Sequence, residues 1–387
     1  MIYTNNTQEL KMPSDDMKVT ANERTVSAKI ERNKKKGLVA LSLFSGGGGL
    51  DLGFSAAGYS ICCSSDIDTF SCDTLELNAG KKFYKHAYSI PTDIRDISAD
   101  SLLSKSNVDK SEIDIVLGGP PCQAFSIFGK RKGLEDPRGN LVWEYLRIIK
   151  EVEPKAFVFE NVAGLMSIHD GKLFDEIEKE LSLNGLYTVS THRYQVADFG
   201  VPQFRDRIFF IGTKSGITVP PMIPTHGDSP RRRPFRTVGE ALRNLPSPGI
   251  DSVVPNHVGR VHSQRIVERY ENLIFGERDP KTRINKLHPE RPSFTIIVGS
   301  DKGGGKGHVH PFFPREVTPR ESARMQTFPD WWKFSGKGRH VIRQVGNAVP
   351  PLFAAVLAEH IKQHVFAFKK KKNYEELVKV LGLGYLL

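Results

Sequence analysis

A cysteine, Cys122, lies five residues beyond the end of a short apolar run. The run Ile113–Leu117 predicts a buried strand, and it leads into the string GGPPCQAFS at Gly118–Ser126. A residue just beyond the carboxyl end of a strand lies where open α/β sheets place their ligand crevice. Prolines on its approach reduce the entropy cost of holding a nucleophile in place. A lone cysteine is commonly a buried structural residue, but the two prolines and the strand end favour a reactive thiol.

Glu160 lies at the matching position after a second apolar run, Phe157–Phe159. A carboxyl group in apolar surroundings has a raised pKa and can deliver a proton near neutral pH. The alternative is that Glu160 and Asn161 form a turn that caps a helix. Since both strand ends can lie at one edge of a sheet, Cys122 and Glu160 are candidates to face one ligand.

Two arginines, Arg205 and Arg207, lie in the string QFRDR directly before the apolar run Ile208–Ile211. We interpret them as a pair in which one arginine meets a ligand while the other braces the loops beneath it. A salt-bridged pair on the surface is the alternative.

A glycine-rich turn, FSGGGG at Phe44–Gly49, separates a strand-like run from a helix-like stretch that ends at Gly58. Glycines at such a turn let the backbone pass close to a ligand and expose amides at a helix N-terminus. Twenty residues beyond Gly46, Asp66 ends the next strand, where a carboxylate can accept hydrogen bonds from a ribose diol. The pattern favours a nucleoside-type cofactor, although a glycine-rich loop alone is equally typical of a structural turn.

These candidates depend on an alternation of strands and helices, which predicts an α/β fold built from βαβ units. We expect strands at residues 38–44, 59–65, 113–117, 156–159 and 208–211, and helices at residues 140–152, 173–183, 318–328 and 350–364. Residues 1–36 are polar and read as an N-terminal arm. Residues 214–316 are rich in Pro, Gly, His and Arg, with 17 Lys plus Arg against 10 Asp plus Glu, and read as a smaller domain.

The composition bounds the function. A net charge of +11 is compatible with a polyanionic partner, but charge alone is weak evidence. Four cysteines in 387 residues make no disulfide framework, and no Cys/His spacing suggests a metal site. The sequence has no apolar run long enough to span a membrane and no secretion signal at its start, so we expect a cytoplasmic protein without a membrane partner.

Taken together, the motifs resemble those of the DNA (cytosine-5) methyltransferase family, from about Leu38 to His364. The strings LSLFSGGGGLDLGF, SDID, TDIRDI, GGPPCQAFS, FENV, QFRDR, TPRESARMQTFPD and GNAVPP occur in the family's order. The resemblance implies a Rossmann-like S-adenosylmethionine-dependent methyltransferase sheet with a second, smaller target-recognition domain. It makes 37–213 the catalytic and cofactor-binding domain, 214–316 the target-recognition domain and 317–366 the part that returns to the catalytic domain, followed by a basic C-terminal tail at 367–387.

The resemblance also implies the chemistry. Carbon 5 of cytosine is a poor nucleophile, so a thiolate must first add to carbon 6. Cys122 takes that role, Glu160 stabilises the charge that reaches N3, and Arg205 binds the base at O2. Arg205 or Arg207 lowers the thiol pKa.

For the cofactor, S-adenosylmethionine, the resemblance assigns Phe44, Ser45, Gly46, Gly47 and Gly48 to the methionine and backbone contacts, Asp66 to the ribose, Ile67, Asp93 and Ile94 to the adenine, and Pro120, Asn347 and Ala348 to the remaining wall. No metal is implied. Family members often carry Glu where this chain has Asp66, and the shorter acid should still reach the ribose.

The implied substrate is a cytosine flipped out of double-stranded DNA. We expect a monomer that protects DNA from a cognate restriction endonuclease. Three alternatives are a catalytically silent DNA-binding regulator of the same fold, an RNA methyltransferase and a nicotinamide-dependent oxidoreductase. The presence of Cys122, Glu160 and both arginines argues against the first, the long basic domain against the second, and the unexplained PPCQ, ENV and QFRDR strings against the third.

Overall fold

The computed structural model describes residues 37–121, 141–249, 252–296 and 307–387. Cys122, the arm at residues 1–36 and most of the glycine string at residues 303–307 lie outside the described residues.

A seven-stranded sheet forms the centre of the described structure, in the order β3-β2-β1-β4-β5-β7-β6. The strands are β1 (Val39–Leu43), β2 (Ser60–Asp66), β3 (Ser89–Pro91), β4 (Ile115–Gly118), β5 (Ala156–Val162), β6 (Thr188–Gln195) and β7 (Asp206–Thr213). The first five run parallel, whereas β7 runs antiparallel to both β5 and β6. The sheet confirms the expected α/β fold, with one antiparallel hairpin at its edge.

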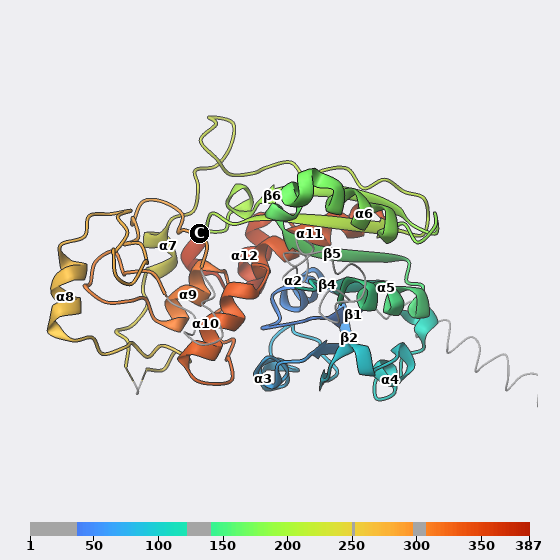
Figure 1. Ribbon diagram of the computed structural model, residues 1–387, viewed down its shortest axis with the longest axis horizontal. Coiled ribbons are helices and arrows are strands. Elements are labelled where there is room, and N and C mark those ends of the chain that lie inside the picture. Colours follow the sequence, from blue (N-terminus) through green and yellow to red (C-terminus); the bar gives the residue numbers. More distant parts are fainter. Residues whose placement is uncertain (1–36, 122–140, 250–251, 297–306) are drawn as a thin grey trace, which may run out of the picture. The chain divides into compact units, whose positions relative to one another are not determined.

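Helices cover both faces of this sheet (Figure 1). Alternate residues of a strand point to opposite faces. Ala40 of β1 therefore belongs to the apolar core that contains α2 (Gly49–Ala57) and α11 (Pro351–His364). Leu41 belongs to the core that contains α4 (Ala99–Leu103), α5 (Leu141–Val152) and α6 (Lys172–Leu181). Burial on both faces explains why β1, β4 and β5 are nearly continuous apolar runs in the sequence.

The C-terminal third adds further helices to the apolar core that contains α2. They are α9 (Pro319–Met325), α10 (Gly338–Asn347), α11 and α12 (Tyr374–Leu381). By length and composition alone the segment Gly338–His364 could cross a membrane, but 83% of its apolar window is buried inside the protein, as in a core helix.

The segment at residues 367–387, expected as a basic C-terminal tail, contains a helix. Its second half folds as α12, which begins with a capping box between Asn373 and Glu376. Leu377 and Leu381 of this helix are buried in the core that contains α2 and α11. The apolar spacing of this segment therefore outweighs the lysine run that precedes it.

The expected smaller domain contains little regular structure. Its helices among the described residues are α7 (Val238–Leu242) and α8 (Gln264–Glu271), and isolated β-bridges pair other parts of it. A small apolar cluster of Tyr270, Leu273, Ile284 and Val309 gives it a core of its own. We call residues 214–316 the recognition region below; residues 38–387 together form one compact unit, and the domain boundaries remain a prediction.

Candidate functional site

A cavity of about 500 Å³ lies at the carboxyl ends of β1, β2, β4 and β5. Thirteen of the residues expected from the sequence line it: Phe44, Ser45, Gly46, Asp66, Ile67, Asp93, Ile94, Pro120, Glu160, Arg205, Arg207, Asn347 and Ala348. Pro121 also lines the cavity. Cys122, the next residue in the sequence, is outside the described residues.

The glycine-rich turn divides into two parts with different roles. Phe44 and Gly46 both have a left-handed backbone, with φ of 53° and 52°, and Gly46 N donates to Asp66 Oδ2 at 2.8 Å. Gly47 and Gly48 do not line the cavity. A Cβ on Gly47 would lie 3.1 Å from Gln344 Cβ, and one on Gly48 would lie 2.5 Å from Leu75 Cδ2. These two glycines are needed for close packing against other segments rather than for an approach to a ligand.

Asp66 lies at the end of β2 with both carboxylate oxygens anchored by main-chain donors. Besides the Gly46 bond, Asp68 N donates to Asp66 Oδ1 at 2.9 Å. Burial raises the pKa of Asp66, while these two amides and the charge of Arg343 oppose the shift. The next residue, Ile67, exposes 69% of its surface and lines the cavity. An acid beside an exposed apolar side chain suits a nucleoside, with a polar sugar and a flat base.

A second acid lies across the cavity. Asp93 caps a short 3₁₀ helix (Ile94–Asp96) by accepting from Arg95 N at 3.0 Å. The Arg95 side chain also bonds to Asp93 and lowers the pKa of its carboxyl. Asp93 is therefore held ionised, as an acceptor for N–H groups.

Glu160, on β5, is 9% exposed and pairs with Arg207, whose Nε lies 2.9 Å from Glu160 Oε1. Burial raises the pKa of Glu160, and the charges of Arg207 and then Arg205 act in the opposite direction. Gly119 makes room for this carboxylate, since a Cβ there would lie 2.9 Å from Glu160 Oε2. Glu160 is thus a buried acid beside a cation, which can hold or share a proton at the cavity wall.

The two arginines have separate partners. Arg205 is only 1% exposed, and its Nη1 and Nη2 donate to the carbonyls of Gly346 at 2.8 Å and Asn347 at 3.3 Å. Burial, followed by the nearby charge of Arg207, lowers the pKa of Arg205 to about 9. The geometry therefore gives the bracing role to Arg205 and the partnership with Glu160 to Arg207, whereas the resemblance had implied that Arg205 contacts the base.

The other cysteines are unsuited to nucleophilic chemistry. Cys62, Cys63 and Cys72 are buried and unpaired among the described residues. Burial raises the pKa of the Cys62 and Cys72 thiols to about 12. A thiol with so high a pKa is inert near neutral pH, which leaves Cys122 as the candidate nucleophile.

A buried carboxyl group beneath the glycine-rich turn was missed by the sequence reading. Asp51, on α2, accepts from Ser42 Oγ at 2.5 Å and Ser64 Oγ at 2.7 Å. Ser45 Oγ, on the cavity wall, donates to Ser42 Oγ at 2.9 Å. Burial raises the pKa of Asp51 to about 6. The available signal was a single acid within the otherwise uncharged helix GLDLGFSAA.

Further missed residues lie next to motifs that were recognised. Asn161 lines the cavity and donates from Nδ2 to Pro120 O at 3.2 Å, which ties the two strand-end loops together. Arg343 and Gln344 also line the cavity and lie two to three residues before the string GNAVPP. Asn161 lies within the FENV string and the other two lie near GNAVPP, so these motifs were the signal that could have found all three.

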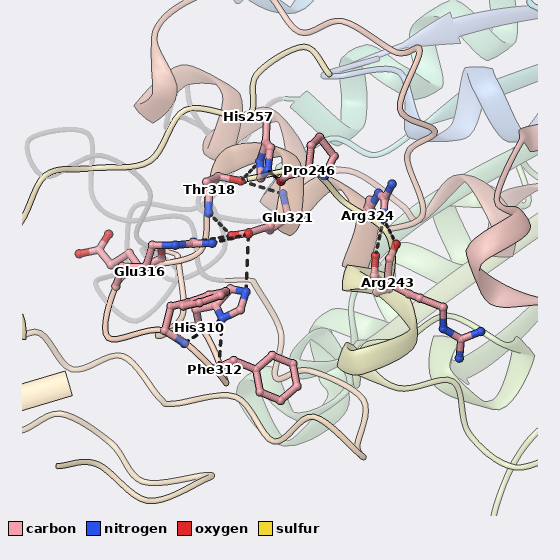
Figure 2. A network of polar contacts seen from close by, with 12 residues as sticks. Arg243, Pro246, His257, His310, Phe312, Glu316, Thr318, Glu321 and Arg324 are labelled. Atoms are coloured by element: carbon pink, nitrogen blue, oxygen red, sulfur yellow. Dashed lines mark hydrogen bonds and ion pairs between the residues drawn. The ribbon is translucent and has the colours of Figure 1, made fainter. Parts of the chain in front are cut away.

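The recognition region is fastened to the first turn of α9 by a buried polar network (Figure 2). Thr318 and Glu321 form the capping box of α9. Both terminal nitrogens of Arg315 donate to Glu321, at 2.8 and 2.7 Å. His257 connects the same turn to Pro246, because its Nδ1 lies 2.9 Å from Thr318 Oγ1 and its Nε2 lies 2.7 Å from Pro246 O.

Part of the arginine run at residues 231–236 has a structural partner. Arg233 pairs with Glu375 and lies over the Tyr374 ring, 5.2 Å from its centroid. Arg236 lies 5.8 Å from the same centroid. These two arginines hold α12, so the basic excess of this region is not wholly free for a polyanion.

Comparison with known proteins identifies this arrangement. The family model for C-5 cytosine-specific DNA methylases matches residues 38–363. The type II methyltransferase M1.HphI of Haemophilus parahaemolyticus is 37% identical over 343 residues, which cover 84% of this chain and 86% of the relative. The type II methyltransferase M.NgoFVII of Neisseria gonorrhoeae is 34% identical over 356 residues, which cover 87% and 90%.

Solved structures agree in fold. A structure described as a prophage-encoded DNA modification methyltransferase of E. coli matches with a TM-score of 0.68 at 28% identity, covering 85% of this chain and all of the other. The Dnmt2 methyltransferase of S. pombe shares the fold, with a TM-score of 0.54 at 18% identity over 84% of this chain and 99% of the other.

The chain belongs to the family of C-5 cytosine-specific DNA methylases, and membership of this family implies an S-adenosylmethionine-dependent methyltransferase. It is a DNA (cytosine-5) methyltransferase, as the sequence predicts.

Proposed function

We propose that this chain is the modification enzyme of a type II restriction-modification system, and that its cavity binds S-adenosylmethionine beside a flipped cytosine. The observation that carries the proposal is the meeting, in one cavity, of the Gly46–Asp66 turn and the Glu160–Arg207 pair. The first suits a nucleoside and the second a pyrimidine ring that gains negative charge during the reaction. The type II assignment follows the relatives named above.

The residues fit the cofactor. The cavity volume of about 500 Å³ lies within the usual range for ligand sites. Asp66 and Asp93 supply acceptors for the sugar and the base amino group, and Ile67 supplies an exposed apolar surface for the ring. S-adenosylmethionine, when bound, supplies an electrophilic methyl group on its sulfonium.

The chain's own groups prepare the cytosine. We assign Cys122 as the thiolate that adds to carbon 6 of the ring. Glu160 carries a proton or a short hydrogen bond at N3 as charge develops there, and Arg207 holds its carboxylate in place. Arg205 braces the turn at Gly346 and Asn347, so it acts on the cavity wall. This assignment makes Arg207 the arginine nearer to the base.

Three further statements belong to the proposal. The enzyme acts in the bacterial cytoplasm, it functions as a monomer, and a restriction endonuclease of the same specificity accompanies it. Support comes from the relatives, which are type II methyltransferases of bacteria.

Bisulfite sequencing of DNA treated with the protein and S-adenosylmethionine tests the function. Protected cytosines at one short recurring sequence are expected. A matched reaction with Cys122→Ser should protect none, while that variant still binds the same duplex. If bisulfite converts every cytosine of DNA treated with the wild-type protein, although cofactor binding has been demonstrated, the proposal is refuted. That result would favour the silent DNA-binding regulator.

A further inference from the structure

The loop that leads into β7, at the start of the QFRDR string, is paired with a segment of the recognition region. Ser293 N donates to Pro202 O at 2.9 Å, and Phe204 N donates to Ser293 O at 2.8 Å. Thr295 Oγ1 then donates to Phe204 O at 2.7 Å. Residues 202–204 and 293–295 therefore lie side by side as a short parallel bridge.

A pair of buried glutamines continues this contact to the cofactor side of the cavity. Gln203 Oε1 accepts from Ile296 N at 3.4 Å, and Gln203 Nε2 donates to Gln326 Oε1. Gln326 Nε2 in turn donates to Ala348 O. Both glutamines are fully buried, and Ala348 lines the cavity. One continuous chain of hydrogen bonds thus runs from Ile296 to the cavity wall.

The same wall is held at two more carbonyls. Arg205, two residues after Gln203, donates to the carbonyls of Gly346 and Asn347. Three successive carbonyls, at residues 346–348, are therefore bound either by the 203–205 segment or by Gln326. We call residues 346–348 the wall turn.

Helix α9 links the two regions a second time. In its first turn, Glu321 accepts from Arg315 and Thr318 contacts His257, and both partners belong to the recognition region. The C-terminal cap of α9 is Gln326. Every residue of α9 is buried. A displacement of the recognition region therefore reaches Gln326 both through Gln203 and through the helix.

We infer that Gln203 and Gln326 are positioning residues that hold the wall turn in register with residues 293–296, so that DNA bound by the recognition region and cofactor bound in the cavity strengthen each other's binding. The inference rests on the proposed function, in which these are the two binding regions. A buried amide that loses its partner cannot be rehydrated, so the chain of bonds favours matched positions of both ends. Coupling between two sites is reciprocal and has a measurable factor.

The test compares the affinity of the protein for S-adenosylhomocysteine, the unreactive product, in the presence and absence of duplex DNA. The duplex contains the sequence that the enzyme methylates. Isothermal titration gives the two dissociation constants, and their ratio is the coupling factor. We expect a factor of at least about 5 in the wild-type protein. Gln326→Met removes the bond that both routes share and should bring the ratio to within twofold of 1. Gln203→Met leaves the route through α9 and should lower the ratio only in part. The double variant should match Gln326→Met. Gln203→Asn, which keeps an amide of shorter reach, serves if a methionine variant does not fold.

Asn78 provides the matched control. It is a fully buried amide whose Nδ2 donates to Thr74 O at 2.7 Å and Lys333 O at 2.8 Å. These bonds involve neither Ile296 nor Ala348, the two ends of the chain of hydrogen bonds. Asn78→Leu should lower stability yet keep the wild-type ratio. A wild-type ratio near 1, or glutamine variants that retain the wild-type ratio, would overturn the inference. If the wild-type protein binds no S-adenosylhomocysteine at all, the proposed function fails first.

Discussion

Adding one methyl group at Gly119 should slow the chemical step without unfolding the protein. The alanine Cβ would lie 2.9 Å from Glu160 Oε2, closer than real Cβ contacts come. The same Cβ would lie 3.7 Å and 3.9 Å from the carbonyl oxygen and the Cβ of Glu160, which are ordinary contacts. The carboxylate must therefore move by about half an ångström, because an ordinary contact needs roughly 3.5 Å.

The displacement of the carboxylate should affect catalysis, because the other oxygen of Glu160 is held by Arg207. Its Oε1 lies 2.9 Å from Arg207 Nε, so a displaced carboxylate weakens that pair and misses the position where N3 of the base must lie. A misplacement of about 1 Å can cost about 100-fold in rate. We expect Gly119→Ala to lower the rate of methyl transfer by about 10- to 100-fold, or about 1.4 to 2.7 kcal/mol in activation free energy. Stability should change by no more than about 1 kcal/mol, since alanine also reduces the entropy of the unfolded chain.

The assay is single-turnover transfer of a labelled methyl group to a duplex containing the target sequence, which separates chemistry from product release. Gly164→Ala is the matched control, because a Cβ there meets nothing within 4 Å. Glu160→Gln combined with Gly119→Ala should be no slower than Glu160→Gln alone. A Gly119→Ala enzyme with a rate within twofold of the control would refute the role given to Glu160.

Three other perturbations separate charge, packing and cofactor binding. Burial raises the pKa of Asp51 to about 6 from 3.8, so the folded protein binds this proton more tightly than the unfolded chain does. The contribution of the protonated Asp51 to stability is therefore lost as the pH rises from about 4 to about 6. Denaturant unfolding should show wild type losing about 2 kcal/mol relative to Asp51→Asn between pH 4 and pH 7. Arg315→Ala leaves the buried Glu321 without its bidentate partner and should lower the free energy of unfolding by about 3 kcal/mol, whereas exposed Arg231→Ala should change it by less than about 0.5 kcal/mol. Ile67→Ala removes an exposed side chain that lines the cavity. Calorimetry should show S-adenosylhomocysteine binding about 5- to 30-fold weaker, with an unchanged melting temperature. An unchanged affinity would show that Ile67 does not contact the cofactor.

The strand-end residues could be predicted because their signals are local. Asp66 and Glu160 each follow an apolar run, and a parallel sheet brings such ends to one edge without further information. The glycine-rich turn was recognisable for the same reason. The packing role of its inner glycines could not be predicted, because their partners are distant in sequence. Gly47 packs on Gln344, and Gly48 packs on Leu75 and Trp332.

The remaining differences come from tertiary packing. Helix α12 follows a lysine run that favours a solvated tail, and only the core around α2 and α11 makes its apolar face a buried one. Asp51 resembles a surface acid until Ser42 and Ser64 are seen beside it. The division of labour between Arg205 and Arg207 depends on where the wall turn lies, which no spacing within QFRDR encodes.

The central claim is that the Cys122 thiol adds to a cytosine ring in the cavity. A duplex with 5-fluorocytosine at the methylated position blocks the final elimination, so the protein and the DNA should remain covalently joined in the presence of S-adenosylmethionine. Peptide mapping by mass spectrometry should place the join on Cys122 in the wild-type protein and detect none in Cys122→Ser. A join on another residue, or an equal yield from the serine variant, would contradict the account.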